Sequence, residues 1–235
     1  RGIDKNAQIG DLVFLAEHGY AVFCADFRNS AQAHFPAQIV DAKAAVRCVR
    51  ANAGRYGIDP DRIGVMGRSA GGEIVSMLGL NDGKYISEEW KDYSSEVQLV
   101  WDMFGPADLK KSVGEDMEAY ANGTADTSRW TCVEQTHAGA YLGGSGEELL
   151  RRAAEASPAL HVHDGMPPFL IMHGDADPAV PCSQSEDFYE KILAAGPHNV
   201  ADLYLLKGAG HGTPEFFAPM TQQIALDFLD KYLKG

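Results

Sequence analysis

Residues 62–72 read RIGVMGRSAGG, and their pattern indicates the class of fold. Its first half, Arg62–Gly67, is a short apolar run that is typical of a buried strand. A helix is predicted to follow at once, from about Ala70 to Leu80, which leaves Gly-Arg-Ser-Ala-Gly in a sharp strand-to-helix turn. Such a turn crowds its own backbone, so glycine is expected at positions 67 and 71 to avoid a clash. The stretch therefore predicts one strand–turn–helix unit of an α/β protein.

The same alternation continues on both sides of this unit. Further strands are predicted at 20–26, 97–104, 168–173 and 201–206, and helices at 6–18, 36–56, 147–156, 183–195 and 214–233. Strands separated by helices form βαβ units, and right-handed crossovers then give a mostly parallel, doubly wound sheet with helices on both faces. We expect a single domain over residues 1–235. Within it, the less periodic stretch 106–163 is interpreted as a cap-like excursion that carries substrate contacts.

Ser69, the central residue of the turn, is the candidate nucleophile. The turn would project its hydroxyl above the carboxyl edge of the sheet. The N–H of Ala70, at the start of the helix, would be free to bind an oxyanion. The alternative interpretation is a Gly/Ser-rich turn without chemical consequence. The strand before it and the helix after it favour the catalytic interpretation.

A serine nucleophile needs a base, and His211 is the best placed of the eight histidines. It lies in GAGHG, residues 208–212, between the last predicted strand and the last predicted helix, at the same edge as Ser69. His173 ends a strand and is expected to be structural.

The acid that would orient His211 is expected after the preceding strand. Asp177 in HGDADPAVP is the candidate, and it would stabilise the imidazolium that forms as Ser69 attacks. Asp175 in the same loop is interpreted as a surface or turn carboxylate. Asp102 and Asp108 are weaker alternatives for the acid.

Composition excludes several other classes of function. The 20 Lys and Arg against 33 Asp and Glu give a net charge of −13, which disfavours nucleic-acid and membrane-surface binding. No apolar run reaches the roughly 18 residues of a membrane span. The four cysteines show no metal-ligand spacing, so no metal site is predicted, and a Cys132–Cys182 disulfide stays open.

Several motifs together resemble the esterase/lipase group of the α/β-hydrolases, including hormone-sensitive-lipase-like and carbohydrate (acetyl or feruloyl) esterases. These motifs are GRSAGG at 67–72, PPFLIMHGDADPAVP at 167–181, GAGHG at 208–212, DFR at 26–28, FPAQIVDAKAAVR at 35–47, YGIDPDRIGVMG at 56–67, FGPAD at 104–108 and ASPALHV at 156–162. The resemblance implies the α/β-hydrolase fold, the order Ser69, Asp177, His211, and hydrolysis of short-chain esters, small or linked to plant polysaccharide, without a cofactor. Arg68 and Glu73 depart from the common residues beside the nucleophile, and we expect them to contact substrate.

A second departure concerns the HGG motif that supplies half of the oxyanion hole in this group, because no HGG occurs in the chain. The strand leading into that motif would lie between the strands predicted at 20–26 and 62–67. We therefore expect residues 1–235 to be part of a longer product, or another chain to supply the missing strands. Ala70 alone would otherwise serve the oxyanion.

Two other functions fit the same residues. An amidase or peptidase, such as an arylformamidase, would use the same scaffold, and a non-catalytic α/β-hydrolase would bind ligands or partners instead. The location stays open between the cytoplasm and secretion after removal of a signal peptide.

Overall fold

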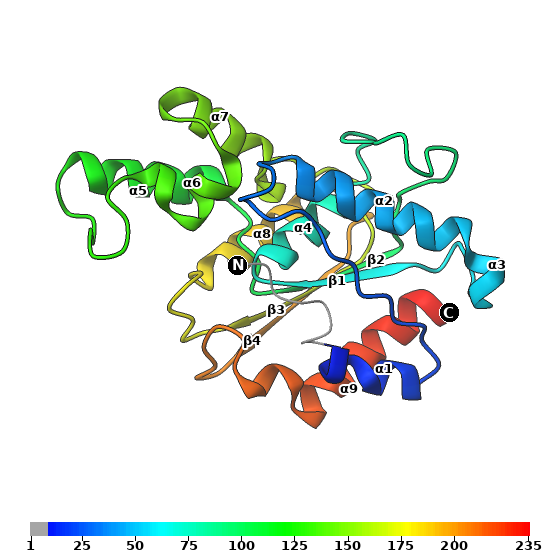
Figure 1. The fold of residues 1–235 in the computed structure, drawn as a ribbon. Coiled ribbons are helices and arrows are strands. Elements are labelled where there is room, and N and C mark those ends of the chain that lie inside the picture. Colours follow the sequence, from blue (N-terminus) through cyan, green and yellow to red (C-terminus); the bar gives the residue numbers. More distant parts are fainter. Residues whose placement is uncertain (1–8) are drawn as a thin grey trace.

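A four-stranded parallel sheet forms the centre of the computed structural model, which describes residues 9–235 (Figure 1). Its strands lie side by side in chain order as β1 (Gly64–Arg68), β2 (Leu99–Met103), β3 (Phe169–Gly174) and β4 (Ala201–Leu206). All residues of β2 and β3 are buried, which is why apolar residues occupy both faces of these strands instead of alternating with exposed ones. Asp102 in β2 and His173 in β3 are the polar residues among them. The predicted parallel α/β fold is thus confirmed.

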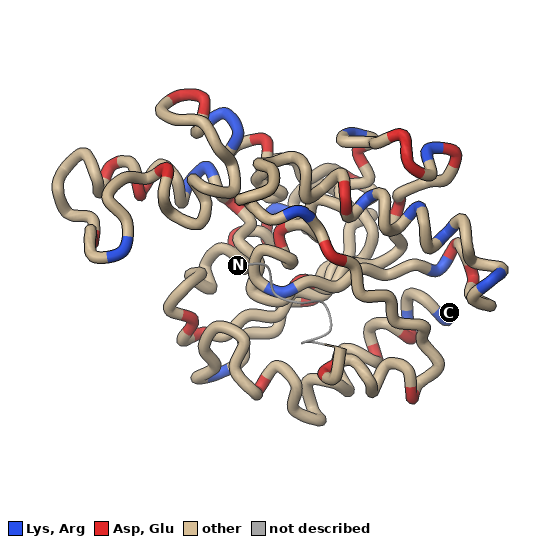
Figure 2. Tube along the Cα trace, viewed as in Figure 1, with Lys and Arg blue, Asp and Glu red and all other residues tan. Residues whose placement is uncertain are grey.

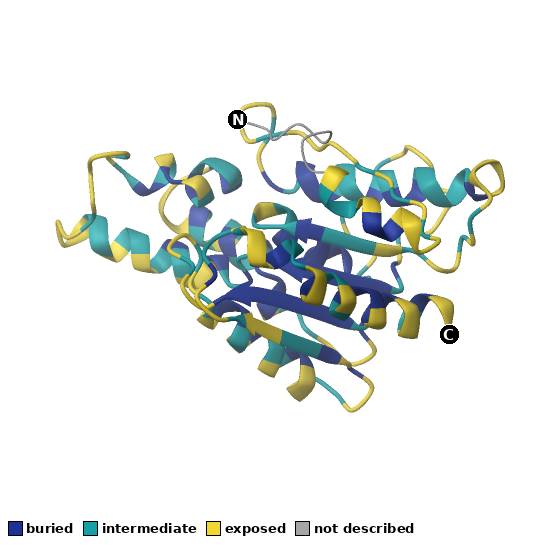
Figure 3. Cartoon of the chain, turned by 90° about the horizontal axis from the view of Figure 1, so that it is seen from below, coloured by how far each residue is buried: buried dark blue, intermediate teal, exposed yellow. Residues whose placement is uncertain are grey.

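Helices cover both faces of the sheet. On one face lie α2 (Ala37–Ala51), α4 (Ala70–Leu78) and α8 (Ser183–Ala194), and on the other α1 (Val13–Glu17) and α9 (Pro219–Leu229). Successive strand residues point to opposite faces, so Val100 packs into the first core and Trp101 into the second. Figure 3 shows the buried strands between these two helical layers.

The remaining helical elements are shorter or lie outside these layers. They are η2 (Ile9–Leu12), α3 (Ala53–Tyr56), α5 (Leu109–Ala121), η3 (Val133–Gln135), α6 (His137–Leu142), α7 (Gly146–Glu155), η4 (Pro158–Leu160), η5 (Pro214–Phe217) and the π-helical η6 (Asp230–Lys234). The helix predicted at 36–56 is interrupted at Asn52, and the one predicted at 214–233 is divided before Pro219. Of the helix predicted at 6–18, residues 6–8 lie outside the described residues.

The strand predicted at 20–26 was wrong. Residues 20–28 are not part of a strand, and β1 pairs only with β2 among residues 9–235. A strand needs a hydrogen-bonded neighbour, and a groove separates this segment from β1. Phe23 and Ala25 of this segment and Val65 and Met66 of β1 all line the groove.

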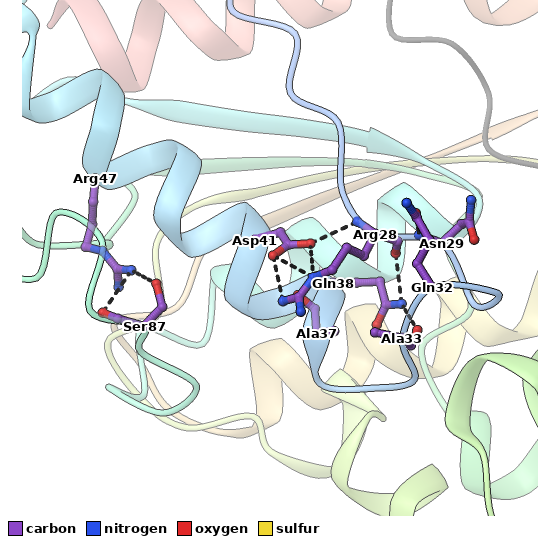
Figure 4. Close-up of polar contacts among 9 residues, drawn as sticks. All are labelled: Arg28, Asn29, Gln32, Ala33, Ala37, Gln38, Asp41, Arg47 and Ser87. Carbon is purple, nitrogen blue, oxygen red and sulfur yellow. Dashed lines mark hydrogen bonds and ion pairs between the residues drawn. The ribbon is translucent and has the colours of Figure 1, made fainter.

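Polar contacts hold the far end of this segment against α2 (Figure 4). Arg28 donates through Nε and Nη2 to the carboxylate of Asp41, at 2.8–3.1 Å. Gln38 Nε2 donates to the carbonyls of Arg28 and Ala33, at 2.9 and 2.8 Å. These contacts anchor the segment to the helix rather than to the sheet.

The stretch 106–163 extends to one side of the sheet and carries α5, α6 and α7 (Figure 1). Only the last of these helices was predicted, at 147–156. The side chain of Asp108 caps α5 by accepting from Lys111 N–H at 2.9 Å, and Thr136 caps α6 by accepting from Gly139 N–H at 3.2 Å.

Three further sequence expectations concern charge, cysteines and membrane spans. Acidic residues are spread over the helices and loops rather than gathered in one segment (Figure 2). All four cysteines are free thiols, so the structure contains no Cys132–Cys182 disulfide. Among the helices of residues 9–235, none is both long and apolar enough to cross a bilayer.

Candidate active site

Ser69 occupies a strained turn between β1 and α4. Its φ of 54° and ψ of −122° lie in a region that residues with a side chain rarely adopt. A Cβ on Gly67 would lie 2.0 Å from the carbonyl oxygen of Gly71, so the first glycine of the motif is required. The expectation for Gly71 was wrong, because a Cβ there meets nothing within 4 Å. The second crowded position is Gly72, where a Cβ would lie 2.2 Å from Asp102 Oδ1.

The structure brings Ser69, His211 and Asp177 together in one hydrogen-bonded chain. His211 Nε2 lies 2.8 Å from Ser69 Oγ, and His211 Nδ1 lies 2.6 Å from Asp177 Oδ2. Because a carboxylate only accepts, Nδ1 carries the proton and Nε2 is free to accept from the serine hydroxyl. The three residues follow β1, β3 and β4, so the sheet gathers them at its carboxyl edge.

Asp177 is held as a buried anion by several donors. Its side chain is 0% exposed, and its Oδ1 accepts from the N–H groups of Ala179 and Val180, at 2.7 and 3.0 Å. Burial by itself acts to raise the pKa of Asp177, but the hydrogen bonds from Val180, His211 and Ala179 outweigh it and the pKa is lowered. Asp177 is therefore ionised at neutral pH, as a partner of an imidazolium must be.

His173 is fully buried beside Asp177, in agreement with the structural role expected for it. Its Nε2 lies 2.9 Å from the carbonyl of Val180 and its Nδ1 lies 2.7 Å from Ser185 Oγ. A carbonyl can only accept, so Nε2 carries the proton and Nδ1 accepts from the serine. Burial lowers the pKa of His173, so the ring is neutral.

The other carboxylates considered for the acid lie elsewhere. Asp175 accepts from Gly208 N–H at 2.6 Å and so ties together the loops that carry Asp177 and His211. Asp102 is buried beneath α4, where it accepts from Gly105 N–H and Ser76 Oγ, at 3.0 and 3.2 Å. Asp108 is the N-cap of α5.

Phe104, which packs against the candidate base His211, was not predicted as a site residue. Its ring lies 4.7 Å from the ring of His211, edge to face, and 4.7 Å from that of Phe216. Phe104 directly follows β2 and has a φ of 46°, which turns the ring toward the site. Phe104 is the first residue of the FGPAD motif at 104–108, one of the motifs that resemble the esterase/lipase group. That motif could have indicated Phe104 as a site residue.

A large cleft of about 2600 Å³ opens above Ser69 and includes the groove beside β1. Ala70 is the first residue of α4, so its N–H has no acceptor within the helix and can donate to an oxyanion next to Ser69. Within residues 9–235, no group of three or more His, Cys, Asp or Glu side chains is placed to hold a metal ion.

Arg68, expected to contact substrate, makes contacts within the chain. Its Nη1 donates to Asp11 Oδ2 at 3.0 Å, and its guanidinium carbon lies 4.2 Å from the centre of the Phe217 ring. Nε and Nη2 are buried, and neither has a hydrogen-bond partner among the described residues. Arg68 thus joins the nucleophile turn to the elements below the sheet.

Glu73, the other residue expected to contact substrate, lies in the wall of the cleft and is only 2% exposed. The Tyr141 hydroxyl lies 3.3 and 3.1 Å from its two carboxyl oxygens. Burial raises the pKa of Glu73 well above its ordinary value, more strongly than the tyrosine hydrogen bond lowers it. Tyr141 was not predicted as a site residue.

The chain is similar in sequence and in fold to known esterases. Esterase LipC of Mycobacterium tuberculosis is 30% identical over 200 residues, which cover 84% of this chain and 46% of that protein. The chain therefore spans about half the length of the curated relatives it matches. Among solved structures, a truncated carbohydrate esterase from gut microbiota is 31% identical with a TM-score of 0.79, over 94% of this chain and 77% of the other. Esterase Est2 of Thermogutta terrifontis is 25% identical with a TM-score of 0.74, over 97% and 76%.

The BD-FAE family model matches residues 4–192, which is most of the chain. This range includes β1, the turn with Ser69 and the loop with Asp177. The resemblance seen in the sequence motifs is thereby confirmed, and the chain belongs to the BD-FAE family of α/β-hydrolase esterases.

Proposed function

We propose that the chain is a serine carboxylester hydrolase that acts through an acyl-enzyme. The observation that carries the proposal is the unbroken chain of hydrogen bonds from Ser69 Oγ through His211 to Asp177. An ionised acid, a base in the required tautomer and a hydroxyl on a strained turn are the three parts that nucleophilic catalysis by serine needs.

The reaction runs in two halves. Ser69 Oγ attacks the ester carbonyl while His211 Nε2 takes its proton, and the negative oxygen of the tetrahedral intermediate accepts from Ala70 N–H. The intermediate collapses, the alcohol leaves with the proton from His211, and Ser69 keeps the acyl group. Water then attacks the acyl-enzyme with His211 again as base, which releases the acid and restores Ser69.

Short-chain acyl esters are the proposed substrates, among them acetyl or feruloyl esters of plant polysaccharide. The similarity to a carbohydrate esterase from gut microbiota supports this class. The amidase, peptidase and non-catalytic alternatives lack such support, because the named relatives and neighbours are esterases.

We further propose that an additional strand, from another chain or another segment of the polypeptide, pairs with β1 in the groove beside it. Alternate residues of a strand direct their N–H groups to opposite sides. Ser69 N–H donates to β2 at Met103, so the N–H groups of Arg68 and Met66 face the groove. A strand seated there would also bring backbone donors to the oxyanion, and one such donor is worth about 10²–10³ in rate.

The test of the main proposal is hydrolysis of p-nitrophenyl acetate, butyrate and octanoate by the wild type and by Ser69→Ala. The wild type should hydrolyse the short esters, and Ser69→Ala should lose at least about 10⁴-fold in kcat. A fluorophosphonate probe, read by intact mass and peptide mapping, should label Ser69 alone. Full activity in Ser69→Ala, or faster cleavage of a matched anilide than of the ester, would contradict the proposal.

A further inference from the structure

Trp130 is an aromatic residue of the excursion that belongs to neither hydrophobic core. It is half-buried, lines the cleft that contains Ser69, and is absent from both clusters of packed apolar side chains within residues 9–235. The Tyr120 hydroxyl donates to the carbonyl of Trp130 at 3.1 Å, which ties its backbone to α5. An indole fixed in a cleft wall outside the core offers a large, rigid apolar surface to a ligand.

Two side chains pack against the indole and hold it in place. Arg129 Cζ lies 4.4 Å from the ring centre, and the ring of His137 lies 4.9 Å away, edge to face. Arg129 Nη2 also donates to His137 Nε2 at 3.3 Å. Groups that contact opposite faces of an aromatic ring are about 7 Å apart, because each keeps a contact distance of about 3.5 Å from the ring. Arg129 and His137 therefore do not lie on opposite faces, and one face of the indole is covered by neither.

The free face of the indole is the one that the cleft exposes. Trp130 and His137 line the cleft, whereas Arg129 does not, so the face that carries the guanidinium is turned away from it. Burial and the charge of Arg129 lower the pKa of His137, so its ring is neutral and Arg129 is the cation beside the indole. A second cation on the free face would be repelled by Arg129. The free face therefore suits a neutral ligand that presents C–H groups.

Hydrogen-bonding groups line the same part of the cleft. Glu115 and Asp116 lie on the face of α5 that lines it, one turn before Tyr120. Their carboxylates accept hydrogen bonds from ligand hydroxyls and repel ligands that carry a negative charge. A neutral sugar ring matches this wall, because it has C–H groups on its face and hydroxyls around its edge.

A continuous wall connects Trp130 with Ser69. His137, which contacts the indole, lies one turn before Tyr141 in α6. The Tyr141 hydroxyl lies 3.1 Å from Glu73 Oε2, and Glu73 lies one turn after Ser69 in α4. The indole thus shares the cleft with the nucleophile but is separated from it by two helical turns, so it is placed for the non-reacting part of an ester.

We propose that the free face of Trp130 is a subsite that stacks against a neutral sugar ring in the alcohol part of the ester. This inference rests on the proposed ester hydrolysis and narrows its substrates to acyl esters of oligosaccharides or polysaccharides. Arg129 and His137 hold the indole in position, so little freedom is lost when the sugar binds. The excursion then selects the carbohydrate, while Ser69 and His211 act on the acyl group.

The test compares esters that differ only in the number of sugar rings. Acetylated methyl xyloside is paired with acetylated xylotetraose, with the acetyl group at the same position of one ring, and a second pair uses the mannose series. The readout is the ratio of kcat/KM for the longer ester to that for the shorter one, in which changes in the chemistry at Ser69 cancel. The wild type should prefer the longer ester in at least one series.

Three variants separate stacking from other effects. Trp130→Ala should lower the ratio roughly 3- to 10-fold, which is the worth of an aromatic contact. Trp130→Phe keeps an aromatic ring and should retain a larger part of the preference. Trp90→Ala is the matched control, because Trp90 is 46% exposed but does not line the cleft, and it should leave the ratio unchanged.

Binding of unesterified xylotetraose and mannotetraose to Ser69→Ala, with and without Trp130→Ala, gives a readout without turnover when measured by titration calorimetry. Inert wild type with oligosaccharide binding that depends on Trp130 would reject ester hydrolysis and keep the subsite. Active wild type with the same ratios in Trp130→Ala, or with no preference for the longer esters, would reject the subsite and keep the hydrolase. A loss confined to methyl ferulate relative to methyl acetate would assign the indole to an aromatic acyl group and would also overturn the inference.

Discussion

His173 Nε2 lies 3.4 Å from Asp177 Oδ2, the same oxygen that lies 2.6 Å from His211 Nδ1. Two histidines, the buried His173 in β3 and His211 in the loop after β4, therefore converge on one carboxylate oxygen. The buried ring also binds the carbonyl of Val180, whose N–H donates to Asp177 Oδ1. His173 is thus placed to hold Asp177, the acid of the proposed triad, in position.

We expect His173→Phe to lower kcat about tenfold, because Asp177 and the loop at Val180 lose a fixed neighbour. The change also leaves the Val180 carbonyl and the Ser185 hydroxyl without partners, which should cost about 1–3 kcal/mol of stability. Ser185→Ala is the control, since it removes only the far hydrogen bond and should reduce stability with kcat nearly unchanged. Steady-state kinetics and urea unfolding measure both effects; an unchanged kcat in His173→Phe would rule out the positioning role.

The adjacent glycines 71 and 72 should respond in opposite ways to alanine. Gly71→Ala meets open space inside α4 and should stabilise the protein by up to about 1 kcal/mol through helix propensity. Gly72→Ala places a methyl 2.8 Å from Gly105 Cα and 2.2 Å from Asp102 Oδ1, so it should cost about 1–3 kcal/mol or more. Thermal unfolding of the two variants side by side provides the measurement, and equal melting temperatures would contradict the packing described at this turn.

Asp102 should make the protein less stable as pH rises from about 4 to 6. Burial raises its pKa to about 6, so the folded state holds the proton more tightly than the unfolded state. The stabilisation is complete below the unfolded value of about 3.8 and is lost as pH rises through the folded value. Asp102→Asn keeps an acceptor for Gly105 N–H and should remove up to about 3 kcal/mol of this decline. Urea unfolding at several pH values tests it, and parallel profiles for the wild type and Asp102→Asn would refute it.

The rates of amide hydrogen exchange should alternate along β1, because successive N–H groups face β2 and the groove in turn. The amides of Val65 and Gly67 face β2 and should exchange slowly. Those of Met66 and Arg68 face the groove, so they should exchange much faster while the groove is empty and become protected when the proposed strand is seated there. Amide exchange followed by NMR measures all four. Protection of Met66 and Arg68 that increases with protein concentration would indicate that another copy of the chain supplies the strand. Protection independent of concentration would favour a segment of the same polypeptide.

Much of the fold and of the candidate site could be predicted from the sequence because those features are local. The buried strand Phe169–Gly174 begins with the apolar run FLIM, and the turn at Ser69 has its own glycine pattern. Residues 20–25 are also mostly apolar, but among residues 9–235 they have no neighbouring strand to pair with, and pairing cannot be read from composition. Phe104 and Tyr141 were not predicted for a similar reason, because each belongs to the site through a contact with a residue more than 60 positions away in the chain. The ring of Phe104 lies 4.7 Å from that of His211, and the hydroxyl of Tyr141 lies 3.1 Å from Glu73 Oε2.

The order of the strands has a consequence for how the protein is made. Each strand of the sheet lies beside the one that precedes it in the chain, so a polypeptide synthesised from its N-terminus can add β2, β3 and β4 in turn to an existing edge. The loop with His211 follows β4, the last of the four described strands in chain order. In the proposed mechanism Ser69 has no base until this loop has been synthesised and folded. The proposed nucleophile would therefore gain its base only after all four described strands have been made.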